Sequence, residues 1–148
     1  MALTYSGANE LLKVLTGKAG NNNPYPSVYI GLGLSSGTPA RDGTGFTEPS
    51  GANYARVVLG SATTLWQKMG TPSNGSTSNN NSSHELKGRI LFNALGESES
   101  WGEIGYIGLF SAQTGGTLIA YAALDTAYTP SAGSTPEIPA SSLTFTLA

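Results

Sequence analysis

Three glutamates close to a tryptophan are the residues whose types and spacing come nearest to catalysis. Glu97, Glu99 and Glu103 surround Trp101 in the sequence. Two carboxyl groups beside an aromatic ring suit glycoside hydrolysis, in which one acid must be kept protonated. Glycine and serine separate these acids, so a solvated turn before a strand explains the same pattern. A hydrolase therefore stays an alternative that depends on this group of acids.

The sequence contains few residues suited to other kinds of catalysis or to metal binding. A Ser-His-Asp triad would have to use His84, the one histidine, which stands in a polar stretch expected to be an exposed loop. The absence of cysteine excludes thiol nucleophiles and disulfides. Asp42 and Glu48 could offer calcium its preferred oxygen ligands, but no Asp-x-Asp-x-Asp-Gly pattern appears. We therefore expect a protein that is not an enzyme and has no catalytic residue, cofactor or metal.

Composition points to protein contact rather than to nucleic acid or membrane. The 148 residues are 39% hydrophobic and only 11% charged, with a formal net charge of -2. Seven scattered cations do not form the basic cluster that nucleic acid requires. No apolar run approaches the roughly 20 residues of a membrane span, and Met1–Tyr5 lacks the features of a secretory signal. A surface of so little charge is compatible with assembly, because charge keeps soluble monomers apart.

One short helix is predicted over residues 6–16. Ser6 can cap its start, and Gly17 can end it in a left-handed conformation. The apolar face expected from helical spacing consists of Ala8, Leu11, Leu12 and Leu15. A helix this short is not stable alone, so it must pack against the rest of the chain or a neighbour.

Short strands joined by turns make up the rest. Alternating or apolar segments predict strands over residues 27–34, 54–59, 86–95, 104–110, 117–124 and 143–147. Residues 104–124 read as a hairpin around a Gly-Gly turn. Long loops are expected at 35–53 and 128–139, and a flexible polar loop at 69–84. This pattern predicts a mostly β fold: one antiparallel β-sandwich or jelly-roll-like domain over residues 1–148, with one short N-terminal helix.

Two motifs resemble a known family. The first is Glu-x-Ser-Gly-x-x-Tyr-Ala-Arg over residues 48–56. The second is a Trp-Gly strand that starts at Trp101, runs to Phe110 and enters an Ala-x-Thr-Gly-Gly turn at 112–116. Together they resemble small tailed-phage virion proteins of the tail-fibre-like, minor structural or decoration type. The resemblance covers nearly the whole chain, except that residues 65–87 are longer and richer in Asn and Ser than expected.

The resemblance implies a virion component with no catalytic residues to carry over. The candidate structural or contact residues are Leu11, Leu12, Leu15, Tyr54, Arg56, Trp101, Gly115 and Gly116. The architectural interpretation places Tyr54 and Trp101 in or near the core, Arg56 on loop carbonyls or Glu48, and the glycines in a turn.

The leading hypothesis is a structural module of a phage tail, baseplate or capsid surface, made in the bacterial host's cytoplasm. It would form a symmetric homo-oligomer, a trimer being one candidate, and contact other virion proteins. The alternative is a receptor- or glycan-binding module that stacks sugar on Tyr25, Tyr29 or Tyr128. Neither hypothesis involves nucleic acid or membrane.

Overall fold

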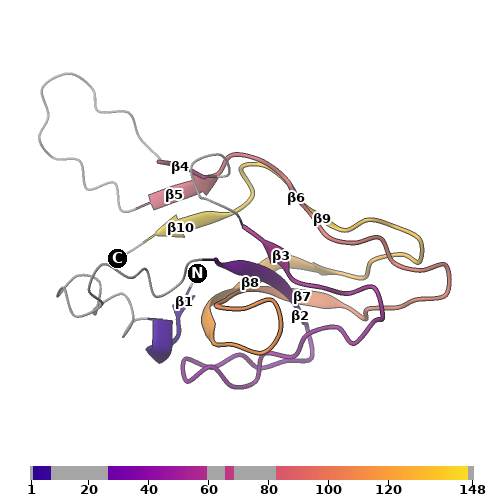
Figure 1. Cartoon of the computed structure of the whole chain (residues 1–148), viewed down its shortest axis with the longest axis horizontal. Helices are drawn as coiled ribbons and strands as arrows, with labels where there is room; N and C mark the ends of the chain where they lie inside the picture. The colour runs from indigo at the N-terminus through magenta and orange to yellow at the C-terminus, as the bar shows by residue number, and fades with distance from the viewer. Residues whose placement is uncertain (1, 8–26, 60–65, 69–82, 147–148) are drawn as a thin grey trace, which may run out of the picture.

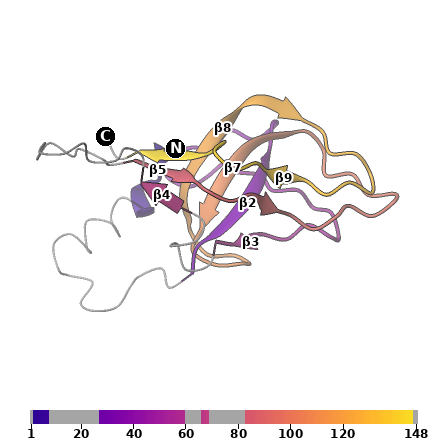
Figure 2. The same cartoon turned by 90° about the horizontal axis from the view of Figure 1, so that it is seen from above.

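The computed structural model describes residues 2–7, 27–59, 66–68 and 83–146. Within them the chain is mostly β, and every strand pairing is antiparallel (Figures 1 and 2). The predicted fold class, mostly β with a short N-terminal helix, is confirmed.

A five-stranded sheet forms one layer. Its order is β1-β8-β7-β2-β3. These strands are β1 (Ala2–Leu3), β2 (Tyr29–Leu34), β3 (Val57–Val58), β7 (Ile104–Phe110) and β8 (Leu118–Tyr128). The predicted hairpin is its centre, because β7 and β8 pair directly across the Gly-Gly turn.

A long two-stranded antiparallel ribbon forms the second layer. β5 (Ser83–Leu86) pairs with β10 (Thr144–Thr146), and β6 (Ile90–Leu91) pairs with β9 (Glu137–Ile138). Backbone hydrogen bonds between the two pairs and beyond them continue the ribbon as far as residues 96 and 133. β4 (Trp66–Lys68) adds a third strand beside β5.

The hydrophobic core lies between these layers. Side chains of alternate residues on β2, Ile30 and Leu32, belong to one buried cluster that also contains side chains from the ribbon. The ribbon contributes Leu86, Ile90, Phe92, Leu95, Ile138 and Leu143. Alternation thus gives each strand one apolar inner face, as in a β-sandwich.

The other face of β2 carries glycines, and an aromatic ring covers them. A Cβ on Gly33 would lie 2.7 Å from the Phe46 ring, and one on Gly108 of β7 would lie 2.8 Å from it. Phe46 belongs to loop 35–50, which therefore folds back over the sheet. This contact explains why residues of low strand propensity occupy the outer face of two central strands.

The N-terminal segment is fixed to β8 by a threonine. Residues 5–7 are helical, and Gly7 N donates a 3.1 Å hydrogen bond to Thr4 Oγ1. Thr4 is fully buried, and its hydroxyl also bonds to the carbonyls of Leu118 and Ile119 on β8. The prediction that Ser6 caps the helix is wrong, because Ser6 lies inside it and the Thr4 hydroxyl accepts the capping bond at its start. The remainder of the predicted helix lies outside the described residues.

The structure also revises some strand and loop boundaries. His84 was expected in an exposed loop, but its backbone pairs within β5, between Phe145 and Lys68. The predicted strand 86–95 is interrupted, with regular pairing only in β5 and β6. The polar loop 69–84 falls outside the described residues except for 83–84. Within the described part of the chain, no helix has the length and apolarity to span a membrane.

Three loops lie together at the end of the molecule away from β5 and β10 (Figures 1 and 2). They are residues 50–54, 96–100 and 130–136. Gly133 N donates to Gly96 O at 3.2 Å, which ties the second loop to the third. The first loop is also the middle of the Glu-x-Ser-Gly-x-x-Tyr-Ala-Arg motif, so this end connects directly to the candidate site.

Candidate functional site

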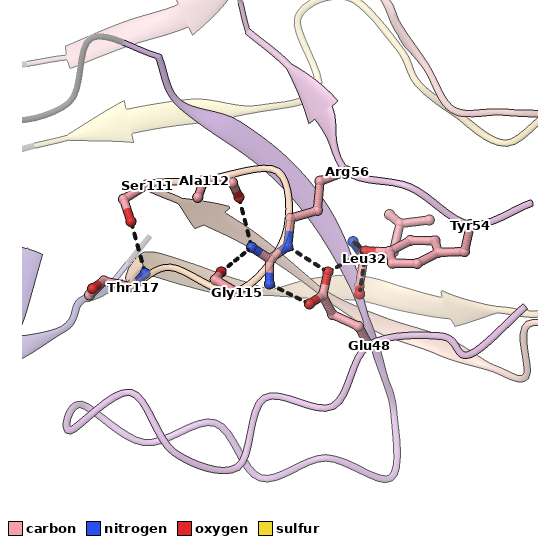
Figure 3. Close-up of polar contacts among 8 residues, drawn as sticks. All are labelled: Leu32, Glu48, Tyr54, Arg56, Ser111, Ala112, Gly115 and Thr117. Atoms are coloured by element: carbon pink, nitrogen blue, oxygen red, sulfur yellow. Dashed lines mark hydrogen bonds and ion pairs between the residues drawn. The ribbon is translucent and has the colours of Figure 1, made fainter.

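Arg56 connects the two sequence motifs, which lie at residues 48–56 and 101–116. It lies at the end of loop 48–56, and its side chain reaches the turn 111–116 between β7 and β8 (Figure 3). Its guanidinium carbon lies 3.4 Å from the centre of the Phe110 ring, a cation–π contact. We call the ion pair between Glu48 and Arg56, with its bonds to the turn, the Arg56 clamp.

The clamp uses the planar fork of the guanidinium. Arg56 Nε donates to Glu48 Oε1 at 2.9 Å, and Nη2 donates to Oε2 at 2.6 Å. Nη1 donates to the carbonyls of Ala112 at 2.8 Å and Gly115 at 2.6 Å. The Arg56 side chain is only 9% exposed and that of Glu48 23%. Bidentate pairing of this kind needs arginine, because lysine offers no fixed fork.

Tyr54 connects the clamp to the sheet. Its hydroxyl donates to Glu48 Oε1 at 2.7 Å and accepts from Leu32 N at 2.9 Å. Burial raises the pKa of this phenol far above its ordinary value, and the hydrogen bond and charge of Glu48 raise it further. A Cβ on Gly31 would lie 2.9 Å from both the Tyr54 hydroxyl and Glu48 Oε1. Glycine in β2 therefore makes room for this contact.

Trp101 and Glu99 contact loop 48–56 through Tyr54 and Asn53. Trp101 is 2% exposed, and its ring meets the Tyr54 ring edge-to-face at 5.3 Å. The Glu99 carboxylate accepts hydrogen bonds from Trp101 Nε1 at 2.9 Å, from Asn53 N at 2.9 Å and from Gly96 N at 2.8 Å. The backbone bonds of Gly96 and Asn53, followed by the Trp101 bond, lower the pKa of Glu99. Glu99 thus links two of the clustered end loops.

The glycines of both motifs occupy positions that other residues cannot take easily. A Cβ on Gly51 would lie 2.5 Å from the Trp101 ring and still closer to Glu99. Gly115 and Gly116 have φ angles of +61° and +70°, in the left-handed region that favours glycine. Ser111 closes the same turn, since its hydroxyl accepts a 2.8 Å bond from Thr117 N. The two motifs therefore describe one assembled unit.

The acids considered for catalysis take other roles. Glu99 has a lowered pKa and is charged at neutral pH, so it is a poor general acid. Glu103 accepts a hydrogen bond from the Ser35 hydroxyl. Of the calcium candidates, Glu48 pairs with Arg56, while Asp42 accepts bonds from the Thr44 amide and hydroxyl. In the described ranges no group of three or more acids and histidines is placed to bind a metal ion.

The leucines and tyrosines that the sequence suggested as contact residues do not lie together in the described part of the chain. Leu11, Leu12, Leu15 and Tyr25 lie outside the described residues. Tyr29 is half-buried in β2, and Tyr128 at the end of β8 is 38% exposed. Sequence reasoning missed Phe46, Asn53 and the role of Glu99. Gly31 and Gly33 lie within the strand predicted at 27–34, and glycines inside a strand are a sequence signal that another group approaches the sheet closely.

The fold and the site define a class: an antiparallel β protein whose motif residues fasten loops to a sheet, as expected of a structural module. Over residues 2–146 the sequence matches the family described as Podophage GP4 fiber I protein gp80. The chain belongs to this family and is thus a phage fibre-type structural protein and a virion component. The sequence resemblance to tailed-phage virion proteins is confirmed. No curated protein shows significant similarity to the chain.

Proposed function

We propose that the chain is a tail or baseplate fibre module without catalytic activity, which assembles with copies of itself and with other virion proteins. The observation that carries this proposal is the family match over residues 2–146. The site supports it, because Glu48, Tyr54, Arg56 and Glu99 direct their polar groups at the chain's own loops. Such contacts build a rigid surface rather than a reaction centre.

The low charge supports self-assembly as a closed symmetric oligomer, with a trimer as one candidate. Light scattering across a range of concentrations measures the mass directly. We expect a discrete multiple of 15.2 kDa that persists on dilution. A monomer at every concentration would contradict self-assembly and favour either docking on a pre-built virion surface or the alternative, a receptor- or glycan-binding module.

The apolar residues Leu11, Leu12 and Leu15 are the proposed contact face. Their joint replacement by serine is expected to shift the oligomer towards monomer. Leu91→Ser is the matched control, because Leu91 is 44% exposed in β6 and loses the same apolar group. Dissociation of the control alone would place the contact on the ribbon instead.

The tail or baseplate is the proposed location, and the capsid surface is the alternative. Antibody labelling of intact particles in negative-stain electron microscopy separates the two. Label at the tail supports the proposal, whereas label over the capsid would make the chain a decoration protein.

A further inference from the structure

Residues 2–7 occupy a site on β8 that requires an occupant. Thr4 is fully buried there: its amide donates to Ile119 O at 2.8 Å, and its hydroxyl donates to the carbonyls of Leu118 and Ile119. Leu118 and Ile119 are themselves buried. Without residues 2–7, these carbonyls would lose their donors in an apolar region, which is unfavourable. A chain of this kind therefore needs an N-terminal segment to complete its sheet.

The segment fits this site closely, so few other sequences can replace it. A Cβ on Gly7 would clash with Ile119 O. Tyr5 N donates to Arg41 O at 2.7 Å, and the Arg41 guanidinium carbon lies 5.4 Å from the centre of the Tyr5 ring. We call residues 118–121 together with Arg41 the β8 site. It selects residues 2–7 by backbone pairing, by the small residue at position 7 and by the contact with Tyr5.

The segment and the β8 site are remote in sequence. Within the described residues, the hydrogen bonds from residues 2–7 to the rest of the chain go to β8 and Arg41. Residues 8–26 connect the segment to residue 27. At 3.3–3.6 Å per residue such a connection spans at most about 65 Å. A folded chain of 148 residues has a radius of gyration of about 15 Å, so the segment can reach the β8 site of an adjoining copy as well as its own.

The contact face proposed above directly follows the segment. Leu11 comes four residues after Gly7, so the two lie within about 14 Å of each other even in a fully extended chain. A copy that contacts a neighbour through Leu11 therefore brings its own residues 2–7 close to that neighbour. Exchange keeps every hydrogen bond of the β8 site and links the copies, which is why swapping an identical element is a low-cost route to oligomers.

We propose that residues 2–7 of one copy occupy the β8 site of a second copy, so that the copies exchange their N-terminal segments around a closed ring. The partner at this site is thus a second copy of the chain, which adds a strand to the edge of the sheet. This inference rests on the self-assembly proposed above and identifies the surface that carries it.

Cysteine cross-linking tests the exchange, because the sequence contains no cysteine. Leu3→Cys and Ala120→Cys are combined in one full-length variant, since these residues lie opposite each other in the register. The bond from Thr4 N to Ile119 O makes them a non-hydrogen-bonded pair, whose Cα separation of about 4.5 Å suits a disulfide. After oxidation, non-reducing denaturing electrophoresis should show covalent multiples of 15.2 kDa.

The matched control is Leu91→Cys/Glu137→Cys. These two residues form the same kind of cross-strand pair within the ribbon. Because both strands of the ribbon belong to one copy, the control should form an intrachain disulfide and remain at 15.2 kDa. If the Ala120 substitution prevents folding, Ala2→Cys/Tyr121→Cys tests the next pair of the same register.

An intrachain disulfide alone between positions 3 and 120 would overturn the proposal, because the segment would then fill the β8 site of its own chain. Equal linkage of copies by the control pair would also contradict it, since collision between copies would explain the multiples. Light scattering of the unsubstituted chain separates the two proposals. A discrete oligomer with intrachain disulfides rejects exchange and leaves self-assembly intact, whereas a monomer rejects both.

Discussion

At the scale of single residues, the hydrogen bonds of the site converge on two carboxylates. Glu48 receives Arg56 and Tyr54, whereas Glu99 receives one indole and two backbone amides. The rings of Tyr54 and Trp101 touch, so the two carboxylates belong to one packed unit. The contribution of each carboxylate to stability can be tested separately. Glu48 forms an ion pair with Arg56, whereas Glu99 accepts hydrogen bonds from neutral donors.

Arg56→Ala should lower the free energy of unfolding by about 3 kcal/mol, because it leaves the partly buried carboxylate of Glu48 without its cationic partner. Arg56→Lys should recover only part of this loss, since lysine cannot reproduce the fork. Urea denaturation measures both. Arg89→Ala is the control: its contact with Glu137 is 3.8 Å long and well exposed, so we expect a change below about 0.5 kcal/mol. Equal losses at Arg56 and Arg89 would contradict the clamp.

Glu99 should make stability depend on pH at the acidic end. Its folded-state pKa lies below the ordinary value of 4.5, so its stabilising contribution is complete above pH 4.5. That contribution is lost as the pH falls through the lowered pKa. Thermal unfolding from pH 6 to pH 3 should therefore show a steeper fall for the wild type than for Glu99→Gln.

The matched control for Glu99→Gln is Glu97→Gln, which removes an exposed carboxylate two residues away. It should keep the wild-type slope of melting temperature against pH. A parallel slope for Glu99→Gln would show that its hydrogen bonds contribute nothing to stability.

At the scale of elements, the hairpin was the easiest part of the fold to predict. Two apolar runs flank Gly115 and Gly116, and the structure places β7 and β8 there. The pairing of β4 with β5 could not be predicted, because polar low-complexity sequence gives no periodic signal around His84. The choice between Thr4 and Ser6 as helix cap also depended on β8, which is distant in sequence.

The outer face of the sheet depends on the fit between glycines and Phe46. Gly108→Ala should cost about 1–3 kcal/mol, because its Cβ would lie 2.8 Å from the Phe46 ring and 2.9 Å from Leu118. In a Phe46→Ala background the same substitution should cost less. A double-mutant cycle measured by chemical denaturation gives the coupling between them. A coupling of zero would mean that the ring moves aside freely.

At the scale of the whole molecule, the fold class followed from turn spacing and alternation, but the assembled site did not. The sequence suggested Glu48 or loop carbonyls as partners of Arg56, and the structure shows both. No pattern in the sequence indicated that the two motifs meet, because their contact depends on how loop 48–56 crosses the sheet. The loop predicted at 35–53 was likewise assigned only by composition, and Phe46 gave no signal within it.

We predict that the chain unfolds as one domain. The shared core between the sheet and the ribbon leaves neither layer with a complete apolar face of its own. Differential scanning calorimetry should show one transition whose calorimetric and van't Hoff enthalpies agree. Two resolved transitions would mean that the ribbon melts independently of the sheet.

The attachment of Thr4 to β8 has a consequence for synthesis on the ribosome. Thr4 and its acceptor on Ile119 are separated by 115 positions. At about 5–20 residues per second, the acceptor is translated roughly 6–23 s after Thr4. The first strand is therefore among the last to pair, and topology of this kind gives slow folding. Until then the growing chain exposes unpaired backbone, so slower translation should prolong this exposure and increase aggregation during expression.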